Sequence, residues 1–324
     1  MPDPDPRTAG RLRRLAEELE ESGFDLGASG PSRDVLLDEV RNALHPPVFE
    51  RRVPSTGAIV DPRAPLASWE EGTDLHVTER TVGEQPIEWA RRFADGLSSW
   101  LLRRTDGTSS WVVFDRPSGS ERDLGVLATA FDATIVQRHP SGTVRVVTER
   151  GVWRWEGFDW HHEPHVASWV DVVTACPEHG DPEVVRAMLE FAVHDLGALG
   201  IGATLVYRPS DEPGPAVEAR LPVPPPLSVS RPLSLAPLRH ALAQVDGAAM
   251  FDRSGALRKL GVRLVPSPEA ERDVDGLLGM RHTSGRRYSY DDPTATVVVV
   301  SEDGPVTVLR AGEVLGSSRR PDRP

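Results

Sequence analysis

Apolar positions follow two different periods along the chain, and each period predicts one kind of secondary structure. A helical spacing, with apolar residues three and four positions apart, predicts helices at residues 7–21, 32–44, 121–131 and 235–244. Runs that alternate, or that are apolar throughout, predict strands at residues 111–114, 134–137, 143–148, 200–207, 245–251, 256–264, 294–301 and 305–309. Ser32 is the expected N-cap of the second helix.

Proline and capping residues set the ends of further elements. Asp181, Pro182 and Glu183 supply an N-cap, a proline at the first helical position and an acid in the first turn, which predicts a helix to about Leu199. Residues 209–237 contain nine prolines, and we expect no regular helix there because each proline removes a backbone donor. This segment should form a long excursion after the strand at residues 200–207.

The length and the distribution of tryptophan indicate two domains. A chain of 324 residues exceeds what one core usually supports. All eight tryptophans lie between Trp69 and Trp169, so the composition changes sharply near residues 165–180. We predict an α/β protein whose parts are an α+β domain with a largely antiparallel sheet (1–165), a junction (166–180), a domain with a mixed sheet flanked by helices (181–318) and a tail (319–324).

Charge and hydropathy exclude some partners. The chain has 37 Lys plus Arg against 49 Asp plus Glu, a net charge of −12, which argues against binding to nucleic acid. No apolar run approaches the roughly 20 residues that span a bilayer, and residues 1–10 do not have the pattern of a signal peptide. We therefore expect a cytoplasmic protein with no membrane partner.

Lysine and cysteine usage narrows the chemistry further. Lys259 is the only lysine and lies in none of the motifs that phosphate-loop, kinase or Schiff-base enzymes need. Cys176 is the only cysteine, which excludes an intramolecular disulfide and a four-cysteine metal site. A run that suits zinc, although its spacing matches no standard finger, consists of His161, His162, His165, Cys176 and His179.

The first of three segments with ligand-binding chemistry begins at Asp246. Its carboxylate suits a divalent cation, and Gly247 and Ala248 follow it at the start of a predicted strand. A glycine at this position lets a ligand approach the backbone closely. An ordinary Asp-Gly turn is the alternative interpretation.

The other two segments suit phosphate and a strand-end ligand. Residues 279–287 combine arginines and hydroxyl groups between glycines, and arginine offers paired donors to phosphate oxygens. Residues 297–304 are an apolar strand followed by Ser301, Glu302 and Asp303, and ligands of α/β sheets often gather at strand ends. A solvated basic turn and a solvated hairpin are the respective alternatives.

In their order along the chain, these segments resemble the diadenylate cyclase (DAC) domain of the bacterial enzymes that make cyclic di-AMP. That family has an Ile-Gly-Ala strand, a proline-rich excursion, and Asp-Gly-Ala, Gly-Thr-Arg-His-Arg and Val-Ser-Glu-Glu motifs. The counterparts here are Ile201-Gly202-Ala203, the stretch after Pro209, Asp246-Gly247-Ala248, Gly279-Met280-Arg281-His282-Thr283 and Val300-Ser301-Glu302-Asp303. The resemblance covers about residues 181–315, under half of the chain, and depends on the common order of five short motifs.

The resemblance implies an enzyme that condenses two ATP molecules into cyclic di-AMP with release of two pyrophosphates. One DAC domain binds one ATP, so two domains face each other in a homodimer or a higher homo-oligomer. It implies these roles: Asp246 and Glu302 with Mg²⁺ or Mn²⁺, Arg281 and His282 with the phosphates, and Gly247, Ala248, Thr283 and Ser301 in nucleotide binding. Soluble sensor-like domains precede some DAC domains, which implies an unknown ligand or protein partner for residues 1–165.

The chain departs from the family pattern at two positions on the phosphate side. Met280 stands where threonine is expected, and Thr283 where a second arginine is expected. The loss of one charge-assisted hydrogen bond costs about 1.5–3 kcal/mol. If this segment is helical, Arg286 and Arg287 lie on the face of Thr283, and we expect them to return the missing charge to the nucleotide. The alternative function is a degenerate DAC-like domain that binds ATP or a cyclic dinucleotide as a sensor.

Aromatic residues give two weaker hypotheses. Tyr288 and Tyr290 are candidates to stack on adenine. The alternating Trp153, Trp155 and Trp160 are candidates to hold a small molecule in the first domain. In both cases the alternative is that the rings fill the interior of the protein, which is the commoner use of such residues.

Overall fold

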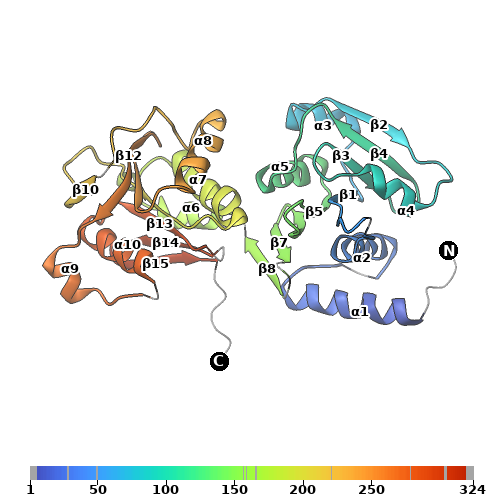
Figure 1. Cartoon of the computed structure of the whole chain (residues 1–324), viewed down its shortest axis with the longest axis horizontal. Coiled ribbons are helices and arrows are strands. Elements are labelled where there is room, and N and C mark those ends of the chain that lie inside the picture. The colour runs from blue at the N-terminus through green and yellow to red at the C-terminus, as the bar shows by residue number, and fades with distance from the viewer. Residues whose placement is uncertain are drawn as a thin grey trace. The chain divides into compact units, whose positions relative to one another are not determined.

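The protein divides into two compact units, Met1–Pro164 and His165–Pro324, and each has its own sheet and core (Figure 1). The structure, a computed structural model, describes residues 6–27, 29–48, 50–155, 157, 159–164, 166–219, 221–277, 279–302 and 305–318. Both sheets are mixed and carry helices. The expected α/β class, with an α+β first unit, is therefore confirmed.

The first unit is built on an eight-stranded sheet with the order β2-β4-β3-β1-β5-β6-β7-β8. The neighbours β1 and β3 run parallel, and the other neighbouring pairs are antiparallel. The sheet is thus largely antiparallel, as expected from its short alternating runs. The strands are β1 (Thr56–Val60), β2 (Val77–Thr81), β3 (Ser99–Arg103), β4 (Ser109–Phe114), β5 (Thr134–Arg138), β6 (Val144–Thr148), β7 (Gly151–Trp155) and β8 (Trp160–Pro164).

Helices cover both faces of the first sheet because neighbouring strand residues point into two different cores. The helices α1 and α2 pack with Val60 and Val136, whereas α3 and α5 pack with Ile59 and Ile135. In Figure 1, α1 and α2 lie side by side within this unit. The helices are α1 (Pro6–Glu21), α2 (Pro31–Leu44), α3 (Leu66–Thr73), α4 (Ile87–Ala90), a 3₁₀ turn (Arg91–Phe93) and α5 (Glu121–Phe131).

The helices and strands predicted for the first unit are confirmed to within two residues, with one wrong cap. Pro31 begins α2 and Gly30 is its N-cap, so Ser32 lies inside the helix. Proline tolerates the first helical position because the N–H that it lacks has no intrahelical partner there. Trp153 and Trp160 are buried in the core beneath α1 and α2. These two rings therefore fill the interior, which is the alternative that the sequence left open.

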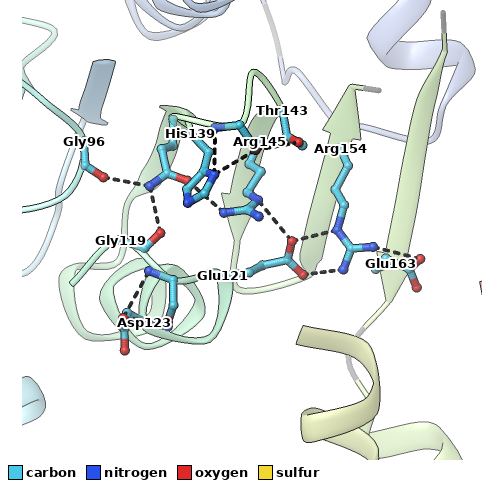
Figure 2. Close-up of polar contacts among 12 residues, drawn as sticks. Gly96, Gly119, Glu121, Asp123, His139, Thr143, Arg145, Arg154 and Glu163 are labelled. Atoms are coloured by element: carbon cyan, nitrogen blue, oxygen red, sulfur yellow. Dashed lines mark hydrogen bonds and ion pairs between the residues drawn. The ribbon is translucent and has the colours of Figure 1, made fainter. Parts of the chain in front are cut away.

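A buried network of charged side chains ties the start of α5 to the far strands of the first sheet (Figure 2). Glu121, the first residue of α5, pairs with Arg154 at 2.5 Å and with Arg145 at 3.3 Å. Arg154 also lies 3.4 Å from Glu163. The side chains of all four residues are at most 6% exposed. Because a buried charge is costly unless it is paired, the four residues depend on one another.

A second charged cluster holds α2 against the 3₁₀ turn, and it makes the first unit sensitive to acid. Asp38 pairs with Arg91 and Arg41 at 2.5 and 2.9 Å. Burial alone would raise the pKa of Asp38, but these arginines hold it below its ordinary value of 3.8. A lowered pKa stabilises the folded state above the unfolded-state pKa, and this contribution disappears as the pH falls through the folded-state pKa.

We therefore expect Asp38→Asn to unfold at lower urea concentration than the parent at neutral pH. The difference between the urea midpoints of parent and variant should narrow as the pH falls below 3.8, because the carboxylate of Asp38 in the parent then becomes protonated and loses its charge. Urea midpoints followed across this range measure the effect. A gap that is the same at neutral and acidic pH would contradict the proposed charge pairing.

The second unit is built on a seven-stranded sheet with the order β10-β12-β11-β9-β13-β14-β15. The neighbours β9 and β11 run parallel, and the other neighbouring pairs are antiparallel. The central strands β9 and β13 are buried along their whole length. The strands are β9 (Ala203–Tyr207), β10 (Val217–Ala219), β11 (Ala248–Phe251), β12 (Leu257–Leu264), β13 (Thr296–Val300), β14 (Val306–Arg310) and β15 (Glu313–Ser317).

Helices cover both faces of the second sheet as well. Val298 and Val300 of β13 face a core shared with α6, α7 and α8, whereas Val297 and Val299 face α10. The helices are α6 (Ala167–Val173), α7 (Pro182–Glu190), α8 (Pro232–Leu242), α9 (Pro268–Asp273) and α10 (Met280–Asp291), with a π turn (Phe191–Leu196) and 3₁₀ turns (Pro177–His179 and Gly197–Leu199).

The helix predicted from Asp181 to Leu199 is confirmed. The prediction that residues 209–237 contain no regular helix is wrong for the last residues of that range. The side chain of Asp181 accepts a hydrogen bond from the N–H of Glu183, and helical turns continue to Leu199. However, α8 begins at Pro232 and contains Pro237. Pro232 occupies the first turn, where no donor is needed, and the helix tolerates Pro237 because it buries Leu238 and Leu242.

Candidate functional site

Three chain segments meet at one edge of the second sheet because of how its central strands run. β9 is parallel to β11 and antiparallel to β13. The start of β9 therefore lies beside the start of β11, where Ala248 pairs with Thr204, and beside the end of β13, where Val300 pairs with Ala203. Residues just outside these strand ends share this edge, and the first turn of α10 reaches it with Arg281.

Arg281 joins the two acids of this edge. Its Nη1 donates a hydrogen bond to Glu302 Oε1 at 3.0 Å, and its Nη2 lies 3.9 Å from Asp246 Oδ1. The side chain of Arg281 is 39% exposed, that of Glu302 73% and that of Asp246 94%. The structure thus gathers Asp246, Arg281 and Glu302 from three separate segments on one accessible surface. We call these three residues the strand-end cluster.

Gly202 leaves the space that the strand-end cluster occupies. A Cβ atom at this position would overlap Nη1 of Arg281 and come within 2.7 Å of Cγ of Glu302. Any side chain at position 202 would therefore require the side chains of Arg281 and Glu302 to shift. Sequence reasoning noted Gly202 only as part of the Ile201-Gly202-Ala203 motif and gave it no role. The structure makes it a positioning residue.

Gly247 is required by the sheet itself. Its φ of +105° lies in the region that favours glycine, and a Cβ atom would come within 2.8 Å of the carbonyl carbon of Gly261 in β12. The fold alone therefore calls for glycine here, and the close approach by a ligand that the sequence suggested stays a prediction. The side chain of Ala248 is buried in the core, so Ala248 offers only its backbone to this edge.

Of the other residues predicted to contact the nucleotide, Thr283 and Ser301 have local hydrogen bonds. Thr283 Oγ1 donates to the carbonyl oxygen of Leu277 at 2.9 Å and accepts the N–H of the same residue at 3.1 Å, which closes the loop before α10. The backbone N–H of Ser301 donates to the carbonyl oxygen of Pro305 at 2.9 Å. His282 is half-buried in the first turn of α10. Asp303 lies outside the described residues.

Arg286 and Arg287 have a different role from the one expected. Arg286 donates to the carbonyl oxygens of Gly312 and Asp275 at 2.6 and 3.2 Å, and Arg287 donates to that of Val274 at 3.4 Å. Both lie on the Thr283 face of α10, as predicted, but that face is turned toward residues 271–277. Their guanidinium groups hold the segment before α10, which argues against their replacing the missing phosphate contact.

The structure also bears on the hypotheses that aromatic residues stack on adenine and that a histidine and cysteine run binds zinc. Tyr288 is 1% exposed in the core of the second unit, and burial raises its pKa to about 12, so the interior interpretation is confirmed for this ring. Tyr290 is 37% exposed. Cys176, His179 and an acid that sequence reasoning did not include, Glu178, place ligand atoms within 4.8 Å of one another.

The zinc run predicted from the sequence is divided between the two units. His161 and His162 lie on β8 of the first unit, and His165 lies outside the described residues. Burial and the nearby charge of Arg310 lower the pKa of His179. The same positive charge would repel a metal ion held by Cys176 and His179, which argues against a zinc site there.

Two family models match the chain, one in each unit. The model described as "DisA bacterial checkpoint controller nucleotide-binding" matches residues 190–314, and the model described as "Probable sensor domain DACNK" matches residues 13–163. The second unit is therefore a DAC nucleotide-binding domain, to which the strand-end cluster belongs. The chain as a whole has the architecture of a DACNK sensor domain followed by a DAC domain, as its motifs indicated.

The comparisons with individual proteins add little. A crystal structure titled as that of a hypothetical membrane spanning protein from Bacillus cereus is 20% identical over 39% of this chain and 59% of its own length, with a TM-score of 0.29. No curated protein matches the chain. Across the ranges that the structure describes, every helix is too short or too polar to cross a bilayer.

Proposed function

We propose that this protein is a diadenylate cyclase that converts two ATP molecules into cyclic di-AMP and two pyrophosphates. The observation that carries the proposal is the strand-end cluster, two carboxylates and one guanidinium, on the edge of a DAC nucleotide-binding domain. Phosphoryl transfer demands little covalent chemistry from a protein. Its main requirements are positioning and compensation of charge, and these side chains supply both.

In each half-reaction, the 3′-oxygen of one ATP bonds to the α-phosphorus of the other. The bond from that phosphorus to the bridging oxygen of the β-phosphate breaks, and pyrophosphate leaves with the electron pair. The proton of the 3′-hydroxyl passes to water. Two such steps close a ring with two equivalent halves, which calls for two domains related by a two-fold axis. The high exposure of Asp246 and Glu302 supports this arrangement, because a facing copy would cover them.

We assign one task to each residue of the strand-end cluster. Arg281 neutralises phosphate charge, and Asp246 and Glu302 lie on either side of it, which limits where its guanidinium can point. Exposed carboxylate oxygens are the ligands that Mg²⁺ and Mn²⁺ prefer, so Asp246 and Glu302 fit such an ion. A bound divalent ion would polarise the α-phosphate and lower the pKa of the 3′-hydroxyl. Gly202 keeps the space in which these side chains meet.

A second candidate function is nucleotide binding without turnover. Thr283 replaces the second arginine of the family motif, and its hydroxyl closes the loop at Leu277. Arg286 and Arg287 are bonded to backbone carbonyls of other segments. The phosphate side therefore has one arginine fewer than the family pattern, which favours weaker chemistry or a purely binding domain.

Incubation of the purified full-length chain with radiolabelled ATP and Mg²⁺ or Mn²⁺ tests the proposal. We expect labelled cyclic di-AMP from the parent and none above background from Asp246→Asn. Asp211→Asn is the matched control, because it removes a carboxylate that is 79% exposed and whose ion pair among the described residues is with Arg253. The control should make product at the parental rate.

Thermal unfolding in the presence of ATP separates the two candidate functions. Stabilisation by ATP without product in either metal would establish the binding domain and overturn the cyclase, and the absence of both effects would overturn both functions.

A dilution series tests the facing pair. Activity per molecule should fall as the chain is diluted, because the two half-sites separate.

A further inference from the structure

A cleft of about 390 Å³ opens in the first unit at the carboxyl end of β1. Its walls include the first turn of α2 and the last turn of α5, helices that pack on opposite faces of the sheet, and the turn between β6 and β7. Pockets of this volume hold small metabolites, and strand ends are where ligands of α/β sheets gather. All residues around it belong to the DACNK domain.

Arginine–aspartate pairs at the rim of the cleft are weak enough to exchange partners. Arg63 lies 3.7 Å from Asp132, and Arg150 lies 3.1 Å from Asp25. The four side chains are between 52% and 76% exposed. Solvent-exposed ion pairs of this kind contribute little to stability, so a carboxylate on a ligand can take over either guanidinium at small cost.

Asp61 lies inside the cleft and is short of positive charge. It is half-buried just after β1, and its two oxygens accept hydrogen bonds from the hydroxyls of Ser32 at 3.1 Å and Thr105 at 3.2 Å. No arginine or lysine in the described ranges forms an ion pair with it. A half-buried carboxylate with only hydroxyl donors is well placed to receive an ammonium group.

The aromatic floor of the cleft argues against nucleosides and sugars. Such ligands are commonly held by stacking on an exposed ring. Trp153 is 2% exposed, with Phe24 against it edge-on at 4.7 Å and His162 stacked on it at 4.1 Å. The indole is thus covered and offers no face to a ligand. The polar side chains that line the cleft are charged or carry hydroxyl groups.

We propose that this cleft is the ligand site of the DACNK domain and that it binds a small zwitterion of the α-amino acid class. Arg63 and Arg150 receive the carboxylate, and Asp61 receives the ammonium group. A ligand of one sign would meet repelling as well as attracting groups, because three arginines and four acids line the cleft. A zwitterion satisfies both sets at once. The site is independent of turnover in the second unit.

Binding of each of the twenty L-amino acids to the full-length chain tests the proposal, by calorimetry and by thermal unfolding followed through tryptophan fluorescence. We expect at least one to bind saturably. Its analogues without the amino group or without the carboxylate should bind at least tenfold more weakly, since each lacks one charge-assisted contact. If no amino acid binds, or if either analogue binds as well as the parent compound, the proposal is overturned.

Variants locate the binding. Asp61→Asn and the double change Arg63→Gln with Arg150→Gln should each weaken binding at least tenfold. Arg13→Gln is the matched control, because Arg13 is 81% exposed on α1 and does not line the cleft. Parental affinity in both cleft variants would place the ligand elsewhere and overturn the site. Far-ultraviolet circular dichroism of each variant verifies that it is folded, and Asp61→Asn preserves the size of the side chain should the double variant fail to fold.

Discussion

Arg281→Gln is expected to reduce the rate of cyclic di-AMP formation by about ten- to a hundredfold. The change removes the one guanidinium that approaches both acids of the strand-end cluster and leaves Asp246 and Glu302 without it. Losing a charge-assisted contact to phosphate costs about 1.5–3 kcal/mol, and each 1.36 kcal/mol is about a factor of ten in rate. Initial rates at saturating ATP, with Mg²⁺ and with Mn²⁺, measure the effect.

Arg253→Gln is the control for Arg281→Gln. Arg253 is 70% exposed and, in the part of the chain that the structure describes, pairs with Asp211 at 3.5 Å. It follows the end of β11 opposite to the end that carries Asp246. This variant should keep the parental rate. Equal rates for Arg281→Gln and the parent would show that the guanidinium does not contribute to the reaction and would count against the strand-end cluster as the active site.

Glu121→Gln is expected to destabilise the first unit by about 3–5 kcal/mol, the usual cost of removing one partner from a buried ion pair. The carboxylate of Glu121 is fully buried between Arg145 and Arg154. Its loss leaves two buried cations with Glu163 as the remaining acid of the network in Figure 2. Urea unfolding followed by tryptophan fluorescence reports on this unit, because seven of the eight tryptophans precede residue 165.

The control for this change is Glu17→Gln on α1. Glu17 is 62% exposed, and its nearest guanidinium, that of Arg13, is 3.9 Å away. Exposed pairs of this kind contribute at most about 1 kcal/mol. A midpoint for Glu121→Gln that matches that of the control would mean that the network contributes no more to stability than a surface pair.

The convergence of the strand-end cluster was predicted because the motifs follow the order found in the DAC family, although the strands that they flank lie in a different order in the sheet. Asp246 precedes β11 and Glu302 follows β13. Both strands pair with β9, β11 in the parallel and β13 in the antiparallel direction, so these two ends share one edge of the sheet. The position of Arg281 followed from its place in the motif. What the sequence did not reveal was the space at Gly202, because a missing side chain has no period and no charge to detect.

The orientation of α10 could not be predicted. Its sequence has no apolar stripe, and the residues that it buries are Gly285, Tyr288 and Ser289. Helical spacing correctly placed Arg286 and Arg287 on one face with Thr283, but spacing alone does not determine which neighbour that face meets. In the folded chain this face meets residues 271–277 and Gly312, so both arginines serve the fold.

The buried network around Glu121 could not be predicted either, because the sequence does not show which strands and helices meet. Arg145, Arg154 and Glu163 occupy alternate positions of short strands, where charged residues normally indicate a solvent-facing side. Only the pairing of β6, β7 and β8 beside α5 brings opposite charges close enough to be buried together. Patterns of polarity along one strand cannot distinguish these two situations.

The contrast between Gly202 and Gly247 predicts which residues would change in related domains that have lost their activity. The backbone of β12 leaves no room for a side chain at Gly247, so this glycine would be retained even after the domain had lost its activity. At Gly202 the three atoms nearest to an added Cβ atom all belong to the side chains of Arg281 and Glu302, so the need for glycine there depends on that ion pair. An intact Asp-Gly-Ala motif therefore does not indicate that such a domain is an active cyclase. A side chain at the position of Gly202 indicates that activity has been lost.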